Sequence, residues 1–217
     1  MKTDLKDFVA SFFLILISLS GAVSLLLALQ DWLVATSGPY AALVLLVVFA
    51  LAYGCLTALA LAAVSFVWPL RVGDYGSTHP QFTLWKVQHV VGELGKLALL
   101  PFFPVFARPL FYSLWGARIG KFVAVGGKII DPRLTVLEDG CVIGEGSLLT
   151  SHAMTKDRFI LREIHIGAEA TVGAGSILMP GVRVGAGSIL LPGSIVRAGT
   201  VVPPGQVWGG VPAVRIK

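Results

Sequence analysis

Hydrophobic and polar positions divide the chain into a strongly apolar first third and a patterned remainder. Residues 8–34 contain one charge, Asp31, and residues 40–70 contain no acid or base. Each run is longer than the roughly 20 residues that cross a hydrocarbon core. We therefore predict two transmembrane helices within residues 1–70, the first over about 5–32. A cleaved signal peptide and a buried core helix are the alternatives for the first and second run.

Lysine and arginine positions predict how these helices are oriented. Lys2 and Lys6 precede the first run, the connector "LVATSGPY" has no basic residue, and Arg71 directly follows the second run. Basic residues flank the cytoplasmic ends of spans. We expect an integral protein of the bacterial inner membrane, with both termini cytoplasmic and a short hairpin outside.

The excess of basic over acidic residues lies in the second part of the chain. Fifteen of the seventeen basic residues, but nine of the twelve acids, follow residue 70. This excess suits anionic lipid or phosphate-bearing ligands. Because no basic run is interleaved with aromatic residues, nucleic acid is not an expected partner.

Residues 71–118 are expected to form interfacial helices. In "FTLWKVQHVVGELGKLALL" the polar residues Lys86, His89, Glu93 and Lys96 recur at helical spacing opposite an apolar side. His89 and Glu93 are either a catalytic pair or, as we favour, part of a solvated helix face. The prolines of "PFFPVF" end this helix, and "ARPLFYSLWGARIG" predicts a second short helix before the next pattern begins.

From residue 119 onward, branched aliphatic residues return every six positions. The first steps fall on Ile119, Val125, Asp131, Leu137, Ile143 and Leu149. After an insertion, "TKDRF", they continue at Ile160, Ile166, Val172, Leu178, Val184, Leu190, Val196, Val202 and Trp208. Fifteen hexads at three per coil predict a parallel β-helix of about five coils over residues 119–217. The second hexad position, often glycine, should lie at a corner with positive φ, and the small fifth position should face the interior.

Several motifs point to a family. "IGAEAT", "VGAGSI", the closing "VWGGVPA" and a histidine just before an insertion resemble the left-handed β-helix hexapeptide acyltransferases. More narrowly, the two spans, "LWGARIG" and "SHAMTKDRFILREIHIGAEATVG" resemble the membrane-bound terminal domains of some non-ribosomal peptide synthetases, such as poly-lysine synthetase. That family usually has Thr and an acidic residue where this chain has Ser151 and Lys156. The implied fold is a transmembrane helical hairpin with interfacial helices, followed by a left-handed parallel β-helix.

This resemblance implies transfer of an acyl group, usually acetyl from acetyl-coenzyme A, to an amine or hydroxyl of a membrane-proximal acceptor. It also implies a homotrimer with active sites between prisms. His152 is the expected general base, because histidine titrates near neutral pH and this one stands beside the insertion. Asp157, which matches an "EDR" motif of the family, would orient it or be a solvated loop carboxylate.

Donor-binding residues are also implied. Backbone amides of the turns at Gly175 and Gly193 would hold the pantetheine arm, and Trp208 would approach the adenine or cap the last coil. Candidates for the coenzyme phosphates are Arg183, Arg197, Arg215 and Lys217. Each of these would otherwise be an ordinary corner or a solvated side chain.

Other readings of the sequence stay open. A zinc hydratase needs three convergent histidines, whereas only His152 and His165 lie in the repeat, so we expect no metal. His165 is expected to be structural or a subunit contact, or else to line the acceptor site. Cys55 and Cys141 are expected to be unbridged, buried hydrophobes. A carrier-protein or aminoacyl thioester as donor, or a non-catalytic membrane assembly or export module, would share these features.

Overall fold

The computed structural model describes residues 4–217 and divides the chain into two compact units. The helical unit contains Met1–Leu70 and Thr83–Phe102, and the coiled unit contains Arg71–Phe82 and Phe103–Lys217. The predicted intermediate domain, 71–118, is thus shared between the two units instead of standing alone. Lys2, used above to orient the first helix, lies outside the described residues.

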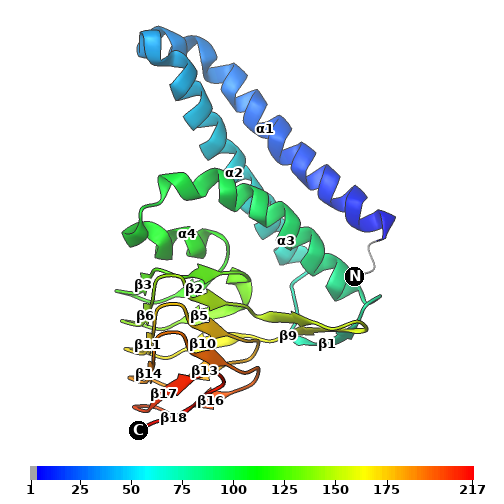
Figure 1. Ribbon diagram of the computed structural model, residues 1–217. Helices are drawn as coiled ribbons and strands as arrows, with labels where there is room; N and C mark the ends of the chain where they lie inside the picture. Colours follow the sequence, from blue (N-terminus) through cyan, green and yellow to red (C-terminus); the bar gives the residue numbers. More distant parts are fainter. Residues whose placement is uncertain (1–3) are drawn as a thin grey trace. The chain divides into compact units, whose positions relative to one another are not determined.

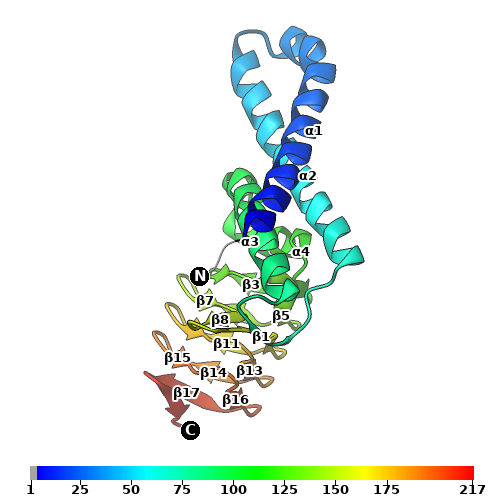
Figure 2. The same cartoon turned by 90° about the vertical axis from the view of Figure 1, so that its right-hand side faces the viewer.

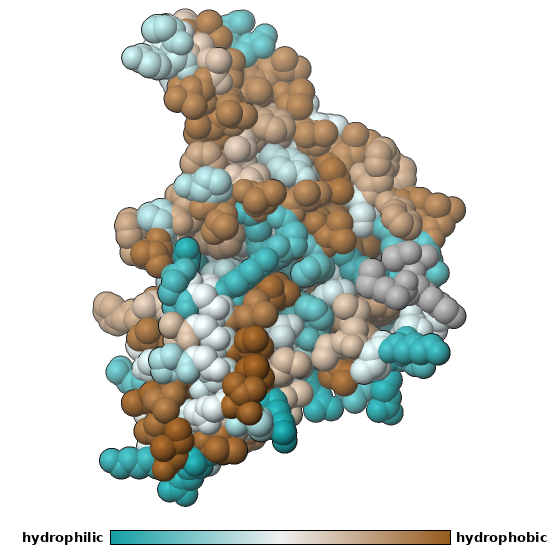
Figure 3. Space-filling model, viewed as in Figure 1, coloured by the Kyte–Doolittle hydropathy of each residue, from teal (hydrophilic) through white to brown (hydrophobic). Residues whose placement is uncertain are grey.

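A long antiparallel helical pair forms most of the helical unit (Figure 1). Helix α1 (Leu5–Ser37) passes through the short 3₁₀ helix η1 (Gly38–Tyr40) into α2 (Ala41–Val67). Small residues allow the two helices to approach closely, since Ala22 and Ala58 are fully buried. By length and composition, the stretch Leu5–Val67 is apolar enough to cross a membrane, and only 11% of its most apolar window is buried. Brown, hydrophobic side chains cover much of this pair (Figure 3).

Helix α3 (Pro80–Leu99), followed by η2 (Leu100–Phe102), does not present its polar stripe to solvent as expected. Lys86 is only 6% exposed and forms an ion pair with the equally buried Asp7 of α1. The apolar residues Val90, Leu94 and Leu97 are exposed instead. The reason is that a buried lysine needs a buried counter-charge, and α1 supplies one from far away in the sequence.

The coiled unit begins with strand β1 (Gly73–Gly76), η3 (Val105–Ala107) and α4 (Arg108–Leu114), and then winds through three parallel sheets. One side of the prism contains β2 (Arg118–Ile119), β5 (Thr135–Leu137), β10 (Ile164–Ile166), β13 (Arg183–Val184) and β16 (Val201–Val202). The second contains β3 (Ala124–Val125), β6 (Val142–Ile143), β11 (Thr171–Val172), β14 (Ile189–Leu190) and β17 (Val207–Gly210), closed by the antiparallel β18 (Ala213–Arg215). The third contains β4 (Lys128–Ile129), β7 (Leu148–Leu149), β12 (Ile177–Leu178) and β15 (Ile195–Val196).

These strands lie above one another as successive coils (Figure 2). The third side has four strands, so four coils close fully and two sides of a fifth follow. The predicted inward positions are in register, for example Leu137 with Ile166 and Ile166 with Val184, and these side chains are buried. The small fifth positions are also buried, among them Ser147, Ser176, Ser188 and Ser194.

Glycine is required at two positions of the hexad for two different reasons. The position with positive φ is not the one that we predicted. Positive φ occurs at the fourth hexad position, as at Gly175 (68°) and Gly193 (69°), and not at the second. At the second position the next coil is too close for a side chain. A Cβ added to Gly167 would lie 2.7 Å from the backbone nitrogen of Ala186. The requirement there is close approach between coils, not an unusual backbone conformation.

The first coil and the insertion also differ from the six-residue frame. Ile129, not Asp131, takes the inward position opposite Leu149, and the turn η4 (Pro132–Leu134) takes up the extra residues before β5. The insertion is a β-hairpin of β8 (His152–Met154) and β9 (Arg158–Leu161), so Ile160 belongs to the hairpin and not to a coil. Strand β1 pairs with β9 and completes a three-stranded antiparallel sheet.

Candidate active site

His152 stands where the inserted hairpin leaves the prism. It is the first residue of β8 and pairs with Leu161, which fixes its backbone. Its side chain is 17% exposed, and Nδ1 lies 2.7 Å from Oδ2 of Asp131, whose side chain is 5% exposed. A histidine and a buried carboxylate therefore form a dyad at this corner.

Asp131 is held rigidly by the turn that disrupts the first coil. Its Oδ2 also accepts a hydrogen bond of 3.0 Å from the backbone N–H of Ser151. Its carbonyl oxygen accepts bonds from the N–H of Leu134 and the hydroxyl of Thr135, each 3.0 Å long. Ser151 Oγ donates to the carbonyl of Leu134 at 2.9 Å. The same short turn thus positions the carboxylate and anchors the residue preceding His152.

This geometry is suited to general-base chemistry. A carboxylate beside Nδ1 favours the tautomer with its proton on Nδ1, which leaves Nε2 as the basic nitrogen. The negative charge of Asp131 also stabilises the imidazolium that forms when Nε2 takes a proton. Thr150 Oγ1 donates to the carbonyl of His152 at 3.0 Å and further restrains this residue.

The structure does not bring Asp157 to His152. Asp157 is exposed at the tip between β8 and β9, beyond the paired residues of the hairpin. Asp131, which the sequence analysis named only as a step of the six-residue frame, is the carboxylate in contact with His152. One signal could have identified it: a carboxylate at a position where the hexad frame expects a buried aliphatic residue.

The two turn glycines suggested for donor binding already use their backbone amides. The N–H of Gly175 donates to the carbonyl of Glu145 at 2.9 Å, and that of Gly193 donates to Ala174 at 2.8 Å. These bonds belong to the ladder between neighbouring coils. The amides of Gly175 and Gly193 are therefore structural groups here.

The remaining predicted donor residues lie in the later coils. Arg183, Arg197, Arg215 and Lys217 are all exposed on the coiled unit. Trp208 is in register with Leu190 on the last coil, and its indole N–H donates to Gln206 Oε1 at 2.9 Å. With β18 paired against β17, this arrangement favours the capping role for Trp208.

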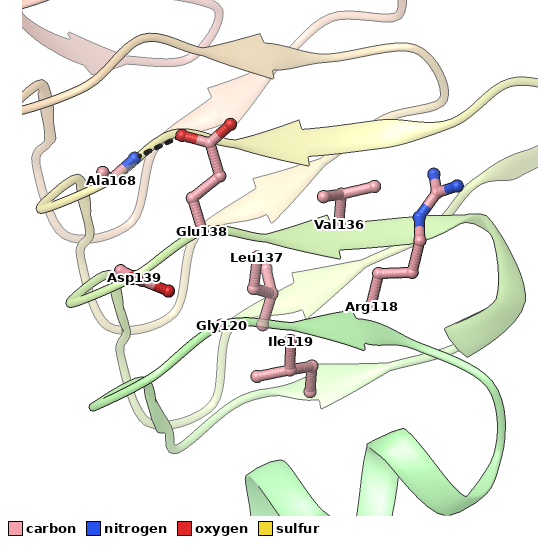
Figure 4. A pocket seen from close by; sticks show the side chains of 8 residues that line it. All are labelled: Arg118, Ile119, Gly120, Val136, Leu137, Glu138, Asp139 and Ala168. Carbon is pink, nitrogen blue, oxygen red and sulfur yellow. Dashed lines mark hydrogen bonds between the residues drawn. The ribbon is translucent and has the colours of Figure 1, made fainter.

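A second histidine–carboxylate pair lies on the outer face of the β2–β5–β10 side. His165 Nε2 is 2.7 Å from Glu138 Oε1, and the other oxygen of Glu138 accepts a bond from Ala168 N at 2.9 Å (Figure 4). The His165 bond and the Ala168 amide hold the pKa of Glu138 below its usual value. Arg118 and Glu138 stand at opposite ends of a shallow cavity of about 490 Å³. His165 thus has a structural partner on this face, apart from the Asp131–His152 corner.

Both cysteines are free, and they differ in burial. Cys141 is fully buried, and burial raises the pKa of its thiol to about 12, whereas Cys55 is exposed on α2, against our expectation of two buried thiols. Among residues 4–217, no group of three or more His, Cys, Asp or Glu side chains gathers as metal ligands would.

Comparison with known proteins relates the fold to acetyltransferases. No protein-family model and no curated protein matches the chain. Among solved structures, galactoside acetyltransferase in complex with coenzyme A has a TM-score of 0.52 at 18% identity, over 66% of this chain and 85% of that one. At such identity the likeness establishes a shared fold.

Two further structures resemble the chain less closely. A hexapeptide-repeat acetyltransferase from Vibrio cholerae O1 biovar eltor, complexed with acetyl-coenzyme A, has a TM-score of 0.44 at 23% identity, over 47% of this chain and 60% of that one. A maltose O-acetyltransferase from Clostridium difficile 630 has a TM-score of 0.47 at 17% identity, over 68% of this chain and 93% of that one. The chain thus spans less than two thirds of the Vibrio protein.

Proposed function

We propose that this protein is a membrane-anchored acyltransferase that moves an acyl group, most simply acetyl, from coenzyme A to an amine or hydroxyl of a membrane-proximal acceptor. The observation that carries the proposal is the Asp131–His152 dyad at the base of the inserted hairpin. The shared fold supports it, because the galactoside acetyltransferase was determined with coenzyme A bound. The membrane-bound synthetase domains remain a resemblance of sequence.

The proposed reaction needs little machinery because a thioester is already activated. As the acceptor nitrogen or oxygen attacks the thioester carbonyl, His152 Nε2 removes its proton and the bond to the acyl carbon forms. The tetrahedral intermediate then collapses, the carbon–sulfur bond breaks, and the imidazolium returns the proton to the coenzyme thiolate. Holding both substrates beside one base supplies the rest of the rate enhancement, because the reacting groups are kept close together.

Two alternatives are tested by the same assay. A carrier-protein or aminoacyl thioester would serve the dyad equally well, whereas an assembly or export module would transfer nothing. Purified protein should be incubated with radiolabelled acetyl-coenzyme A and a membrane extract as acceptor source. Label appearing in the extract supports the proposal. Transfer only from a carrier thioester would select the first alternative, and no transfer from any thioester would select the second.

We predict that the connector between α1 and α2 lies outside the cytoplasm and that both termini and the coiled unit lie inside. Exposed apolar side chains along both helices, such as Phe12, Leu46 and Phe66, support insertion. A cysteine placed at Ser37, in a Cys55→Ser background, should react in intact cells with a membrane-impermeant maleimide. A cysteine added after Lys217 should react only after lysis; the reverse pattern would contradict this topology.

We also predict a homotrimer with parallel prisms. A single flat prism side offers an acyl donor no enclosed cleft, and the outward residues Val142, Ile189 and Val201 leave aliphatic surface exposed. Native mass spectrometry from nanodiscs should record three copies. A monomer that nevertheless turned over acetyl-coenzyme A at full rate would exclude a shared site.

A further inference from the structure

Helix α4 covers the first coil with one face and leaves a second apolar face exposed (Figure 1). Its buried face contains Tyr112, whose hydroxyl donates to the carbonyl of Gly127 in the first coil at 3.3 Å. The exposed face carries Phe106, Leu110 and Leu114, which follow one another at intervals of four residues through η3 and α4 and therefore share one side. Phe106 is 83% exposed. An exposed apolar face of this kind marks a contact with another molecule or with a membrane.

Phe122 adds an exposed aromatic ring at the same end of the coiled unit. It lies in the turn between β2 and β3, and α4 packs against both of these strands. The ring is 94% exposed, and the residue has a φ of 56°. Other coils place glycine at this position of the turn, as at Gly140 and Gly187. Because a bulky residue with positive φ is strained and this ring gains no burial within the chain, its placement points to a contact outside the chain.

The segment that carries this surface is basic. Residues 103–130 contain four basic side chains and no acidic one: Arg108, Arg118, Lys121 and Lys128. The two arginines form ion pairs with glutamates of later coils, whereas Lys121, next to Phe122, is exposed. Apolar side chains edged by basic ones are complementary to an anionic bilayer, which attracts the charge at its headgroups and takes up the apolar groups at the acyl boundary.

We infer that Phe106, Leu110 and Phe122 insert into the headgroup region of an anionic bilayer and hold the first coil against the membrane. This inference rests on the membrane anchoring in the proposed function. The surface continues that anchor along the chain, since Phe103 of the coiled unit directly follows the last residue of the helical unit. A second copy of the chain is a poorer partner, because contact between two such ends would bring like charges together.

This contact also assigns a membrane end to the prism. Asp131 follows the last strand of the first coil, and His152 follows the last strand of the second. The dyad therefore lies near the bilayer, whereas the donor candidates Arg197 and Arg215 lie in the last coils. An acceptor held in the membrane and a donor from the cytoplasm would approach the base from opposite ends of the prism.

The main experiment measures lipid contact of single labelled cysteines in the full-length protein, in nanodiscs that contain anionic lipid. The background is Cys55→Ser, and Cys141 is retained because it is fully buried. An environment-sensitive fluorophore is attached at Phe122→Cys and quenched by lipids that carry a nitroxide at the headgroup. We expect strong quenching at this position, and severalfold less when the anionic lipid is replaced by a zwitterionic one.

Glu169→Cys and Ala186→Cys are the matched controls. Both residues are exposed at the same corner of the prism as Phe122, two and three coils further along. Coils are spaced by about 4.8 Å, so quenching should decrease from Phe122→Cys through Glu169→Cys to Ala186→Cys. Equal quenching at the three positions would overturn the inference. So would emission at Phe122→Cys that reports an apolar environment without quenching and changes when the oligomer dissociates, because a second copy would then cover the ring.

A label at Phe12→Cys in α1 separates this inference from the proposed function. Quenching there by a nitroxide deep in the acyl chains, without quenching at Phe122→Cys, would leave the anchor in place and refute the inference alone. Absence of quenching at both positions would refute the membrane anchor as well. Because lipid contact is measured without any acyl transfer, an inactive protein with the expected decrease along the corner would contradict the enzyme and retain the contact.

Two further variants test the surface itself. Phe106→Gln should lower quenching of the label at Phe122→Cys severalfold, whereas Ile216→Gln, which changes an exposed apolar residue at the far end of the unit, should not. Glycine adopts positive φ without strain, so Phe122→Gly should melt no lower than the wild type in detergent. A lower melting temperature would make Phe122 a structural residue, and unchanged quenching in Phe106→Gln would exclude α4 from the contact; either result refutes the inference as stated.

Discussion

Replacing His152 with alanine is expected to lower acyl transfer by roughly two to four orders of magnitude, the usual loss when a general base is removed. The half-buried imidazole lies at the start of β8, outside the inward columns of the prism, so its removal opens no cavity in the core. The fold and the binding of acetyl-coenzyme A should therefore persist. Turnover of labelled acetyl-coenzyme A with membrane extract measures the first effect, and calorimetry measures the second.

His165→Ala is the matched control for this prediction. His165 also sits beside a carboxylate, but on the outer face of the β2–β5–β10 side, where Glu138 is its partner. We expect this variant to retain the wild-type rate. If His152→Ala were fully active instead, the base would have to be sought at His165 or at the His89 and Glu93 pair of α3.

The six-residue period predicted most of the fold of the coiled unit, because the residues that repeat with this period are the ones buried in its interior. A branched aliphatic residue that returns every six positions must face a narrow interior, and Ile143, Leu149 and Leu178 do so. The period could not reveal the true extent of the insertion. Insertions that differ by six residues restore the same phase, so Ile160 fitted the frame equally well in a coil or in the hairpin. Strand pairing, which the period does not encode, decided between them.

The candidate site was predicted only in part, for a related reason. His152 stood out beside a break in the repeat. Its carboxylate lies twenty-one positions earlier and reaches it across a coil. The match to the family's "EDR" motif favoured Asp157, in the inserted loop, but β8 and β9 pair and place Asp157 at the exposed tip. The same dependence on contacts between distant residues applies to α3. Helical spacing predicted its polar face, but it could not show that Lys86 would be buried in an ion pair with Asp7 of α1.

Replacing Asp131 with asparagine should lower the maximal rate of acyl transfer by roughly a hundredfold to a thousandfold, while the half-saturating concentration of acetyl-coenzyme A changes little. The same oxygen, Oδ2, accepts from Ser151 N and contacts His152 Nδ1. An asparagine oxygen can keep both contacts, so the turn and the imidazole tautomer should survive. The variant loses the negative charge that stabilises the imidazolium during proton transfer.

The matched variants distinguish a positioning carboxylate from a structural one. Asp157→Asn removes an exposed carboxylate from the hairpin tip and should leave the rate near that of the wild type. Asp131→Ala should lose stability as well as activity, because the buried N–H of Ser151 loses its acceptor. Combining Asp131→Asn with His152→Ala should cost no more than His152→Ala alone, since Asp131 acts through the imidazole. Additive losses in that double variant would mean that Asp131 acts independently of His152, and a normal rate in Asp131→Asn would remove the dyad from the mechanism.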